Sequence, residues 1–205
     1  MNNIDTIIFD LGGVLIDWNP KHLYRKIFRT ETAVDYFLEN ITTGEWNEMQ
    51  DGGRSLEEAT KLLVDQFPHY TPEIEAFYDR WEEDMLGGAI EGTVDILRTC
   101  INDKRYRIYA LTNWSAETFP VARKKFEFLN WFEGILVSGE EKLKKPDHRI
   151  YQRLLDKFNL SAAQLLFIDD NLRNIKSAEE FGIKGIHFQS PEILKSQLIE
   201  ENILR

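Results

Sequence analysis

The chain has 205 residues, of which 42% are apolar and 12% aromatic, and its formal net charge is −10. This composition is typical of a folded globular protein and excludes a disordered chain, while the acidic balance disfavours nucleic acid as a partner. The single cysteine, Cys100, excludes an internal disulfide and a cysteine-rich metal site.

The N-terminal segment predicts a buried strand followed by a sharp turn. Residues 6–10 form an apolar run that ends in Asp10, Gly12 and Gly13 follow, and residues 14–16 are apolar again. The sequence MNNIDTIIFD lacks the features of a secretory signal, and no apolar run approaches the roughly 18 residues of a membrane span. We therefore expect a cytoplasmic protein without a membrane partner.

Residues 20–86 have the apolar spacing of helices. Ser55 and Glu58, for example, have the spacing of a capping box ahead of an apolar stripe. Residues 17–92 carry 17 acidic and 7 basic residues, which accounts for the whole net charge of the chain. The change in pattern and in charge predicts that residues 17–92 form a separate helical unit.

The remainder of the chain alternates between strand and helix patterns. Strands are expected over residues 107–113, 134–138, 165–169 and 185–188, and helices over 94–101, 115–128, 149–158 and 175–181. This alternation is typical of an α/β fold with a parallel sheet covered on both faces.

Polar residues stand at the carboxyl ends of three expected strands: Asp10, Thr112, Asn113, Asp169 and Asp170. Open parallel sheets place their sites at this edge, so we expect these side chains to lie together. Three neighbouring carboxylates repel one another unless a cation is present, and hard oxygen ligands favour Mg²⁺. Lys145 precedes a predicted helix and could reach the same edge. An acid, a metal, a hydroxyl and a lysine indicate phosphoryl transfer.

Four segments, residues 10–14, 111–113, 145–146 and 168–171, resemble the ordered motifs of the haloacid dehalogenase (HAD) superfamily. The chain is most similar to phosphatases with a helical cap, including sugar-1-phosphate phosphatase-like members. The resemblance implies a Rossmann-like parallel-sheet core over residues 1–16 and 93–205, with an inserted all-α cap over 17–92. It also implies a small phosphorylated metabolite as substrate. The oligomeric state is not predicted.

The resemblance assigns catalytic and substrate-binding roles by position. Asp10 resembles the nucleophile that forms an aspartyl-phosphate, and Lys145 resembles the lysine that neutralises it and the phosphate. Thr112 and its neighbour Asn113 match the motif that binds phosphoryl oxygens, and the backbone N–H of Gly12 could also face the phosphate.

The resemblance further assigns the Mg²⁺ ligands. Asp10, the carbonyl of Gly12 and Asp170 are the expected direct ligands, and Asp169 is an indirect or water-mediated one. Asn174 resembles a residue that braces the last motif.

Residue 12 departs from the pattern. Most HAD phosphatases have a second aspartate there that protonates the leaving group, and general acid catalysis contributes roughly 10²–10⁴-fold. The interpretation favoured here is a phosphatase of esters with acidic leaving groups, such as sugar 1-phosphates. The alternatives are a 2-haloacid dehalogenase-like hydrolase, a mutase-like transferase and a non-catalytic HAD-fold binding protein. Dehalogenases also lack this aspartate, but they generally lack the acid pair at Asp169 and Asp170 as well.

Several other residues have a structural and a functional interpretation. Asp17 could replace the missing acid, but capping of the first cap helix or contact with Asn19 is favoured. Arg54 follows Gly52 and Gly53 in a possible cap loop and could reach the substrate. Trp114 follows the second motif and could face the site. Core packing is favoured for three cap tryptophans, namely Trp18, Trp46 and Trp81.

Overall fold

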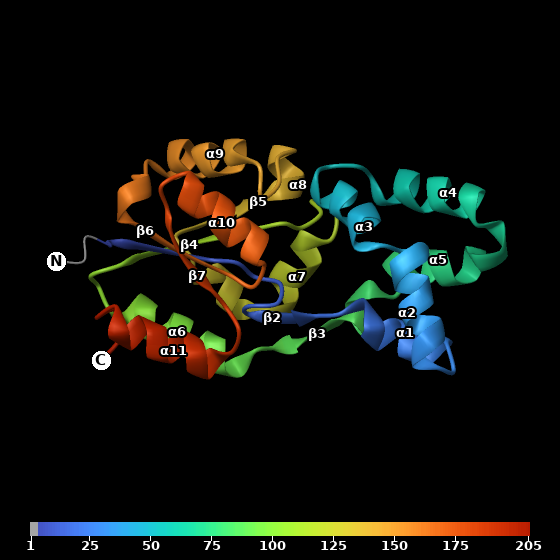
Figure 1. Ribbon diagram of the computed structural model, residues 1–205, viewed down its shortest axis with the longest axis horizontal. Coiled ribbons are helices and arrows are strands. Elements are labelled where there is room, and N and C mark those ends of the chain that lie inside the picture. The colour runs from blue at the N-terminus through green and yellow to red at the C-terminus, as the bar shows by residue number, and fades with distance from the viewer. Residues whose placement is uncertain (1–3) are drawn as a thin grey trace.

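The computed structural model describes residues 4–205 and has two parts, an α/β core and a helical cap. A narrow two-stranded ribbon joins the two parts (Figure 1). Within residues 4–205, no helix has both the length and the apolar character needed to cross a membrane.

The core contains a five-stranded parallel sheet in the order β5-β4-β1-β6-β7. Its strands are β1 (Thr6–Phe9), β4 (Arg107–Thr112), β5 (Gly134–Val137), β6 (Leu165–Asp169) and β7 (Lys184–His187). Phe9 at the end of β1 pairs with Ala110 of β4 and Ile168 of β6. The residues that follow these three strands therefore meet at one edge of the sheet, as the strand-end pattern predicts.

Helices cover both faces of the sheet (Figure 1). The core helices are α6 (Glu91–Asn102), α7 (Phe119–Lys125), α8 (Ser138–Glu141), α9 (His148–Phe158), α10 (Leu172–Glu180) and α11 (Pro191–Glu200). Ile7 and Phe9 belong to a buried cluster with α6 and α11, whereas Ile8 belongs to a cluster with α9 and α10. The strands bury both faces, which explains their nearly continuous apolar sequences.

The main differences between the core helices and the sequence expectation concern α7, α8 and α11, and the short helix α8 lies where no helix was expected. The helix expected over residues 115–128 is shorter, because α7 begins at Phe119 and a short 3₁₀ helix, Glu127–Asn130, follows it. Pro120 lies in the first turn of α7, a position that proline favours. The sequence analysis missed α11, which begins after the N-cap Ser190, with Pro191 as its first residue.

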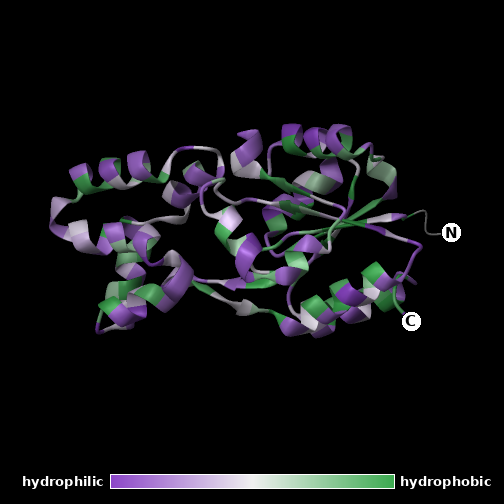
Figure 2. Cartoon of the chain, turned by 180° about the vertical axis from the view of Figure 1, so that it is seen from behind, coloured by the Kyte–Doolittle hydropathy of each residue, from purple (hydrophilic) through white to green (hydrophobic). Residues whose placement is uncertain are grey.

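The cap consists of helices, as its sequence pattern predicts. They are α1 (Pro20–Ile27), α2 (Glu31–Asn40), α3 (Gly44–Asp51), α4 (Leu56–Gln66), α5 (Thr71–Asp79), a 3₁₀ turn (Pro68–Tyr70) and a π-helical turn (Trp81–Met85). Side-chain oxygens of Asn19, Thr30, Thr43 and Ser55 accept backbone N–H groups at the starts of α1 to α4. The apolar helix faces turn inward and the polar faces outward (Figure 2).

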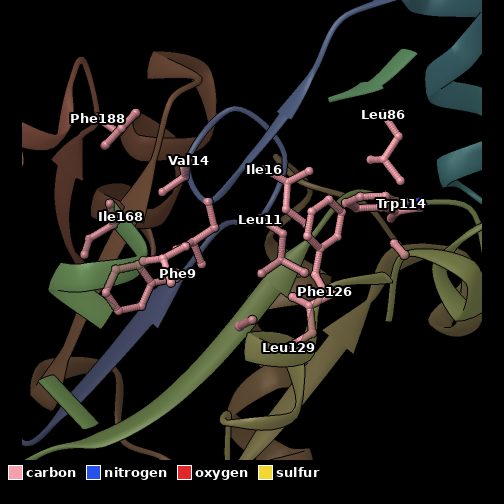
Figure 3. Close-up of a cluster of buried hydrophobic side chains, with 14 of the residues drawn as sticks. Phe9, Leu11, Val14, Ile16, Leu86, Trp114, Phe126, Leu129, Ile168 and Phe188 are labelled. Carbon is pink, nitrogen blue, oxygen red and sulfur yellow. The ribbon is translucent and has the colours of Figure 1, made fainter. Parts of the chain in front are cut away.

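The ribbon pairs β2 (Ile16–Trp18) with β3 (Leu86–Ala89) in antiparallel orientation. The sequence boundary predicted between residues 16 and 17 falls within β2, and that between 92 and 93 falls within α6. Leu11 and Ile16 pack beside Trp114 and Phe126 (Figure 3). This packing fixes the segment that leads from the nucleophile position into the cap.

Candidate active site

Asp10 lies directly after β1 and is almost completely buried. The residue is 7% exposed, and its Oδ1 atom accepts the backbone N–H of Leu11 at 2.7 Å. Its Oδ2 atom lies 2.8 Å from the ammonium nitrogen of Lys145. Burial raises the pKa of Asp10 well above its usual range; Lys145 opposes this effect, whereas Asp169 and Asp170 add to it.

Lys145 is fully buried and its ammonium group is surrounded by oxygen atoms. Nζ contacts Asp10, lies 2.7 Å from Oδ2 of Asp169 and donates a hydrogen bond to the carbonyl of Leu111 at 3.0 Å. Burial would lower the pKa of Lys145, but the charges of Asp10 and Asp169 outweigh it and raise the pKa. The side chain is therefore a fixed cation beside Asp10.

Asn113 holds the backbone of Lys145. Its amide nitrogen donates to the Lys145 carbonyl at 3.0 Å, and its oxygen accepts the Lys145 N–H at 2.9 Å. Both ends of the amide thus position the lysine, although Asn113 also lines the cavity described below. The substrate contact implied by the family resemblance stays a prediction.

Thr112 is buried at the end of β4. Its hydroxyl oxygen has no hydrogen-bond partner among the described residues, and Thr112 is not one of the cavity-lining residues. A buried hydroxyl without a partner is costly. It is consistent with the expected role of binding a phosphoryl oxygen, because such a ligand would satisfy it.

Asp169 and Asp170 follow each other at the end of β6 but have different surroundings. Asp169 is fully buried and accepts hydrogen bonds from Asn171 N–H at 2.7 Å and from the Asn174 amide at 3.1 Å. Asn174 therefore braces this loop, as its assigned role requires. Asp170 is exposed, and partial desolvation together with the Asp169 charge raises its pKa.

The carboxylates of Asp10, Asp169 and Asp170 fit a divalent cation. One oxygen from each lies within 4.8 Å of the others. Their hard oxygen atoms are the ligands that Mg²⁺ prefers. Burial is the largest cause of the raised pKa values of Asp10 and Asp170, and the neighbouring carboxylates add to it. A bound cation would offset both effects.

The two glycines after Asp10 have different constraints. Gly13 has φ +74°, and a Cβ atom there would lie 2.3 Å from Oδ2 of Asp170. Gly12 has no such constraint, since a Cβ atom there would meet nothing within 4 Å and φ lies outside the left-handed region. The structure therefore requires glycine at position 13 but leaves room for a side chain at position 12.

A cavity of about 340 Å³ opens above the carboxylates, between the core and the cap. Asp10, Gly12 and Asp170 belong to its core side, and Asn113 to Ser115 extend that wall. The opposite side includes five apolar or aromatic residues, namely Trp18, Phe77, Tyr78, Trp81 and Met85, and Trp114 adds a further aromatic ring from the core wall. A ligand attached to Asp10 would therefore contact a predominantly aromatic wall.

Some of the tryptophans line the cavity, and one packs in the core of the cap. Trp18 and Trp81 line the cavity, so the core-packing interpretation does not describe them fully. Trp46 instead packs its ring against Phe77 and Tyr78, with ring centroids 5.0 and 5.5 Å apart. Trp114 lines the cavity and donates its indole N–H to the Thr118 hydroxyl at 3.0 Å.

Asp17 and Arg54 lie away from the cavity lining. Asp17 is exposed and pairs with His22 at 3.0 Å, while Asn19 caps α1, so the capping role favoured for Asp17 is wrong. Arg54 donates to the side chain of Gln50 at 2.8 Å and to the Trp46 carbonyl at 2.9 Å. Its guanidinium thus braces the cap.

Sequence reasoning missed two polar cap residues of the cavity, Asn47 and Asp51. Both lie on α3, and no sequence signal separates them from the solvated acids and amides of the other cap helices. Burial raises the pKa of Asp51 to about 7. A carboxyl group that is half protonated near neutral pH can donate or accept a proton.

Ion pairs connect α3 to the core. Glu48 lies 2.9 Å from the guanidinium of Arg173 and also pairs with Lys144. Burial acts to raise the pKa of Glu48, but the two cations outweigh it and lower the pKa. These contacts hold α3 over the carboxylate cluster.

Comparison with curated proteins finds phosphatase and cyclase relatives. The chain is 28% identical over 180 residues to the sesquiterpene phosphatase astK of Aspergillus oryzae, which covers 88% of this chain and 87% of that protein. It is 23% identical to the drimenol cyclase drtB of Aspergillus calidoustus; that match covers 95% of this chain but only 36% of the cyclase.

Comparison with solved structures supports the fold. A HAD family enzyme, bt-2542 from Bacteroides thetaiotaomicron, solved as a magnesium complex, has a TM-score of 0.69 at 22% identity and covers 92% of this chain and 94% of its own. A dehalogenase intermediate complex has a TM-score of 0.67 at 17% identity, with 92% and 86% covered. The family profile for haloacid dehalogenase-like hydrolases matches residues 4–182, and the chain belongs to this family.

Proposed function

We propose that this hydrolase is a Mg²⁺-dependent phosphatase of small phosphate esters that acts through an aspartyl-phosphate on Asp10. The observation that carries the proposal is the position of Asp10, which contacts Lys145 and lies beside two further carboxylates in the cavity between core and cap. A buried carboxylate beside a fixed cation is suited to attack phosphorus.

The reaction needs two displacements at phosphorus. In the first, a carboxylate oxygen of Asp10 bonds to phosphorus while the bond from phosphorus to the ester oxygen breaks. In the second, water attacks phosphorus, the bond to Asp10 breaks and inorganic phosphate leaves. Lys145 offsets charge on Asp10 and the phosphoryl group. Mg²⁺ bound by Asp10, Asp170, the Gly12 carbonyl and, indirectly, Asp169 would supply further positive charge.

Two substrate classes are compatible with the cavity. Sugar phosphates remain a candidate, because the polar side chains of Asn47, Ser115 and Thr118 line the cavity with its aromatic rings. Phosphate esters of apolar alcohols are the second candidate. They are favoured by the aromatic and methionine wall and by the similarity to a sesquiterpene phosphatase.

A substrate panel tests the proposal. It contains an aryl phosphate, a sugar 1-phosphate, a prenyl monophosphate and a 2-haloacid, each assayed with Mg²⁺ and with a chelator. We expect phosphate release that stops with the chelator, and no halide release. Halide release that survives chelation would instead support the dehalogenase alternative, and no turnover of any compound would support the binding-protein alternative.

A further inference from the structure

A phosphatase that acts on alkyl esters must protonate the oxygen that leaves phosphorus, and Gly12 has no side chain to do so. Four residues that line the cavity have a titratable proton: Asp10, Asp51, Tyr78 and Asp170. Asp10 and Asp170 belong to the cluster suited to a cation. The hydroxyl of Tyr78 donates to Asn47 at 2.9 Å and accepts from Gln50 at 2.7 Å, and burial raises its pKa. Asp51 is the remaining acid.

Asp51 is the last residue of α3 and faces the core. The backbone N–H of Ser115 points to its carboxyl group as a hydrogen-bond donor, and Ser115 belongs to the segment that follows Thr112 and Asn113. Glu48 lies one helical turn earlier and is held by Lys144 and Arg173. The cap thus holds the Asp51 carboxyl in the same cavity as Asp10.

We propose that Asp51 is the catalytic acid that protonates the leaving oxygen, replacing from the cap the aspartate that is missing at position 12. This inference rests on the proposed phosphatase function. As the bond from Asp10 to phosphorus forms and the ester bond breaks, the proton of Asp51 moves to the ester oxygen and an alcohol leaves. The Asp51 carboxylate then accepts a proton from the water that attacks phosphorus, which restores both aspartates.

The charges around Asp51 support this protonation state. Burial is the largest effect and raises its pKa; Lys144 and Lys145 lower it, and Glu48 raises it. Tyr78 also faces the group, as a neutral hydroxyl. The negative end of the α3 dipole adds to the preference for the neutral acid. With a pKa of about 7, Asp51 is protonated in a substantial fraction of molecules near neutral pH.

The proposal is tested by measuring how the rate of the first displacement, under single-turnover conditions, depends on the acidity of the leaving group. With an acid present, the wild-type protein should hydrolyse alkyl and aryl phosphates with a shallow dependence on leaving-group acidity. Asp51→Asn should lose roughly 10²–10⁴-fold with alkyl phosphates but less than about tenfold with 4-nitrophenyl phosphate, whose leaving group needs no proton. The wild-type rate with alkyl phosphates should fall as the pH rises through about 7, and Asp51→Asn should not show this fall.

Two further variants make the test specific. Asp17→Asn removes an exposed acid outside the cavity and should change neither rate. Gly12→Asp, added to Asp51→Asn, should restore part of the alkyl phosphate activity, because the space at position 12 is open.

Each remaining outcome contradicts the proposal. If Asp51→Asn lost the same activity with alkyl phosphates as with 4-nitrophenyl phosphate, Asp51 would have a structural role. If the variant lost no activity, Asp51 would take no part in the reaction. A steep dependence in the wild-type protein would show that no acid is present, even if Asp51→Asn failed to fold. Absence of all phosphate hydrolysis by the wild-type protein would instead refute the proposed function.

Discussion

The ammonium nitrogen of Lys145 lies 2.8 Å from Oδ2 of Asp10, with both side chains buried. The same nitrogen contacts Asp169 at 2.7 Å, so one cation serves two carboxylates while Asp170 lies nearby. The cluster thus holds more negative than positive charge when no metal is bound. This imbalance gives predictions for stability and for metal binding.

Asp10→Asn should not destabilise the metal-free protein at about pH 8 and should raise its Tm. The pKa of Asp10 is higher in the folded state than in the unfolded state. Stability therefore falls as the pH rises from the pKa of the unfolded state to that of the folded state, because the folded protein must ionise a buried carboxyl group. The asparagine removes this cost, and the Tm difference should shrink at low pH, where Asp10 is protonated in both states. Calorimetry with a chelator checks this; a Tm several degrees lower for the variant would show that the pair with Lys145 is net stabilising.

Mg²⁺ should raise the Tm of the wild-type protein, and Asp170→Asn should abolish most of this increase. At a concentration 100 times its dissociation constant, a ligand adds about 2.7 kcal/mol of stability. Asp170 is exposed, so its replacement should leave the metal-free fold intact. Thermal unfolding of the wild type, Asp170→Asn and the control Asp17→Asn is the measurement. An unchanged Mg²⁺ response in Asp170→Asn would refute the ligand assignment.

Gly13→Ala should destabilise the protein, whereas Gly12→Ala should not. The left-handed backbone at Gly13 costs about 1–2 kcal/mol for alanine, and contact with Asp170 adds to this cost. At Gly12 the added methyl group meets open space, so stability should stay unchanged or rise by up to about 1 kcal/mol. Urea unfolding of the two variants provides the comparison. Equal destabilisation would contradict the difference described between these positions.

Glu48→Gln should weaken the closed arrangement of cap and core without unfolding either part. Its ion pairs with Lys144 and Arg173 are partly exposed, so their contribution to stability should be roughly 0–1 kcal/mol. The pKa of Glu48 is lowered, so its ion pairs with Lys144 and Arg173 persist until the pH falls through this lowered pKa.

We expect kcat/KM of Glu48→Gln to be several-fold lower and less sensitive to salt than that of the wild type. Glu39→Gln, at an exposed cap position, is the matched control. Unchanged kcat/KM and salt response in Glu48→Gln would show that these pairs do not hold α3 over the site.

The sequence was informative where a polar residue follows a buried strand. The apolar runs before Asp10, Thr112 and Asp169 indicate parallel strands, and the topology of such strands brings their ends together. The positions of the carboxylates and of Lys145 follow from this rule and from the four family motifs.

The cavity wall was less predictable because it depends on tertiary contacts. A helical pattern shows that α3 is amphipathic but not that Asp51 faces the core while Glu48 pairs with Arg173. Likewise, Trp46 and Trp81 have similar sequence surroundings, yet only Trp81 lines the cavity. The missed α11 had a readable signal, since Ser190 and Pro191 are a typical helix start.

The most direct test of the central claim is the rate of phosphate release by Asp10→Asn from an aryl phosphate with saturating Mg²⁺. The asparagine keeps the size of the side chain but cannot act as the nucleophile. We predict a loss of at least roughly 10⁴-fold, the scale observed when nucleophiles are removed, in a variant that still folds and binds inorganic phosphate. Turnover within about tenfold of the wild-type rate, with reversion to aspartate excluded by mass spectrometry, would contradict the account.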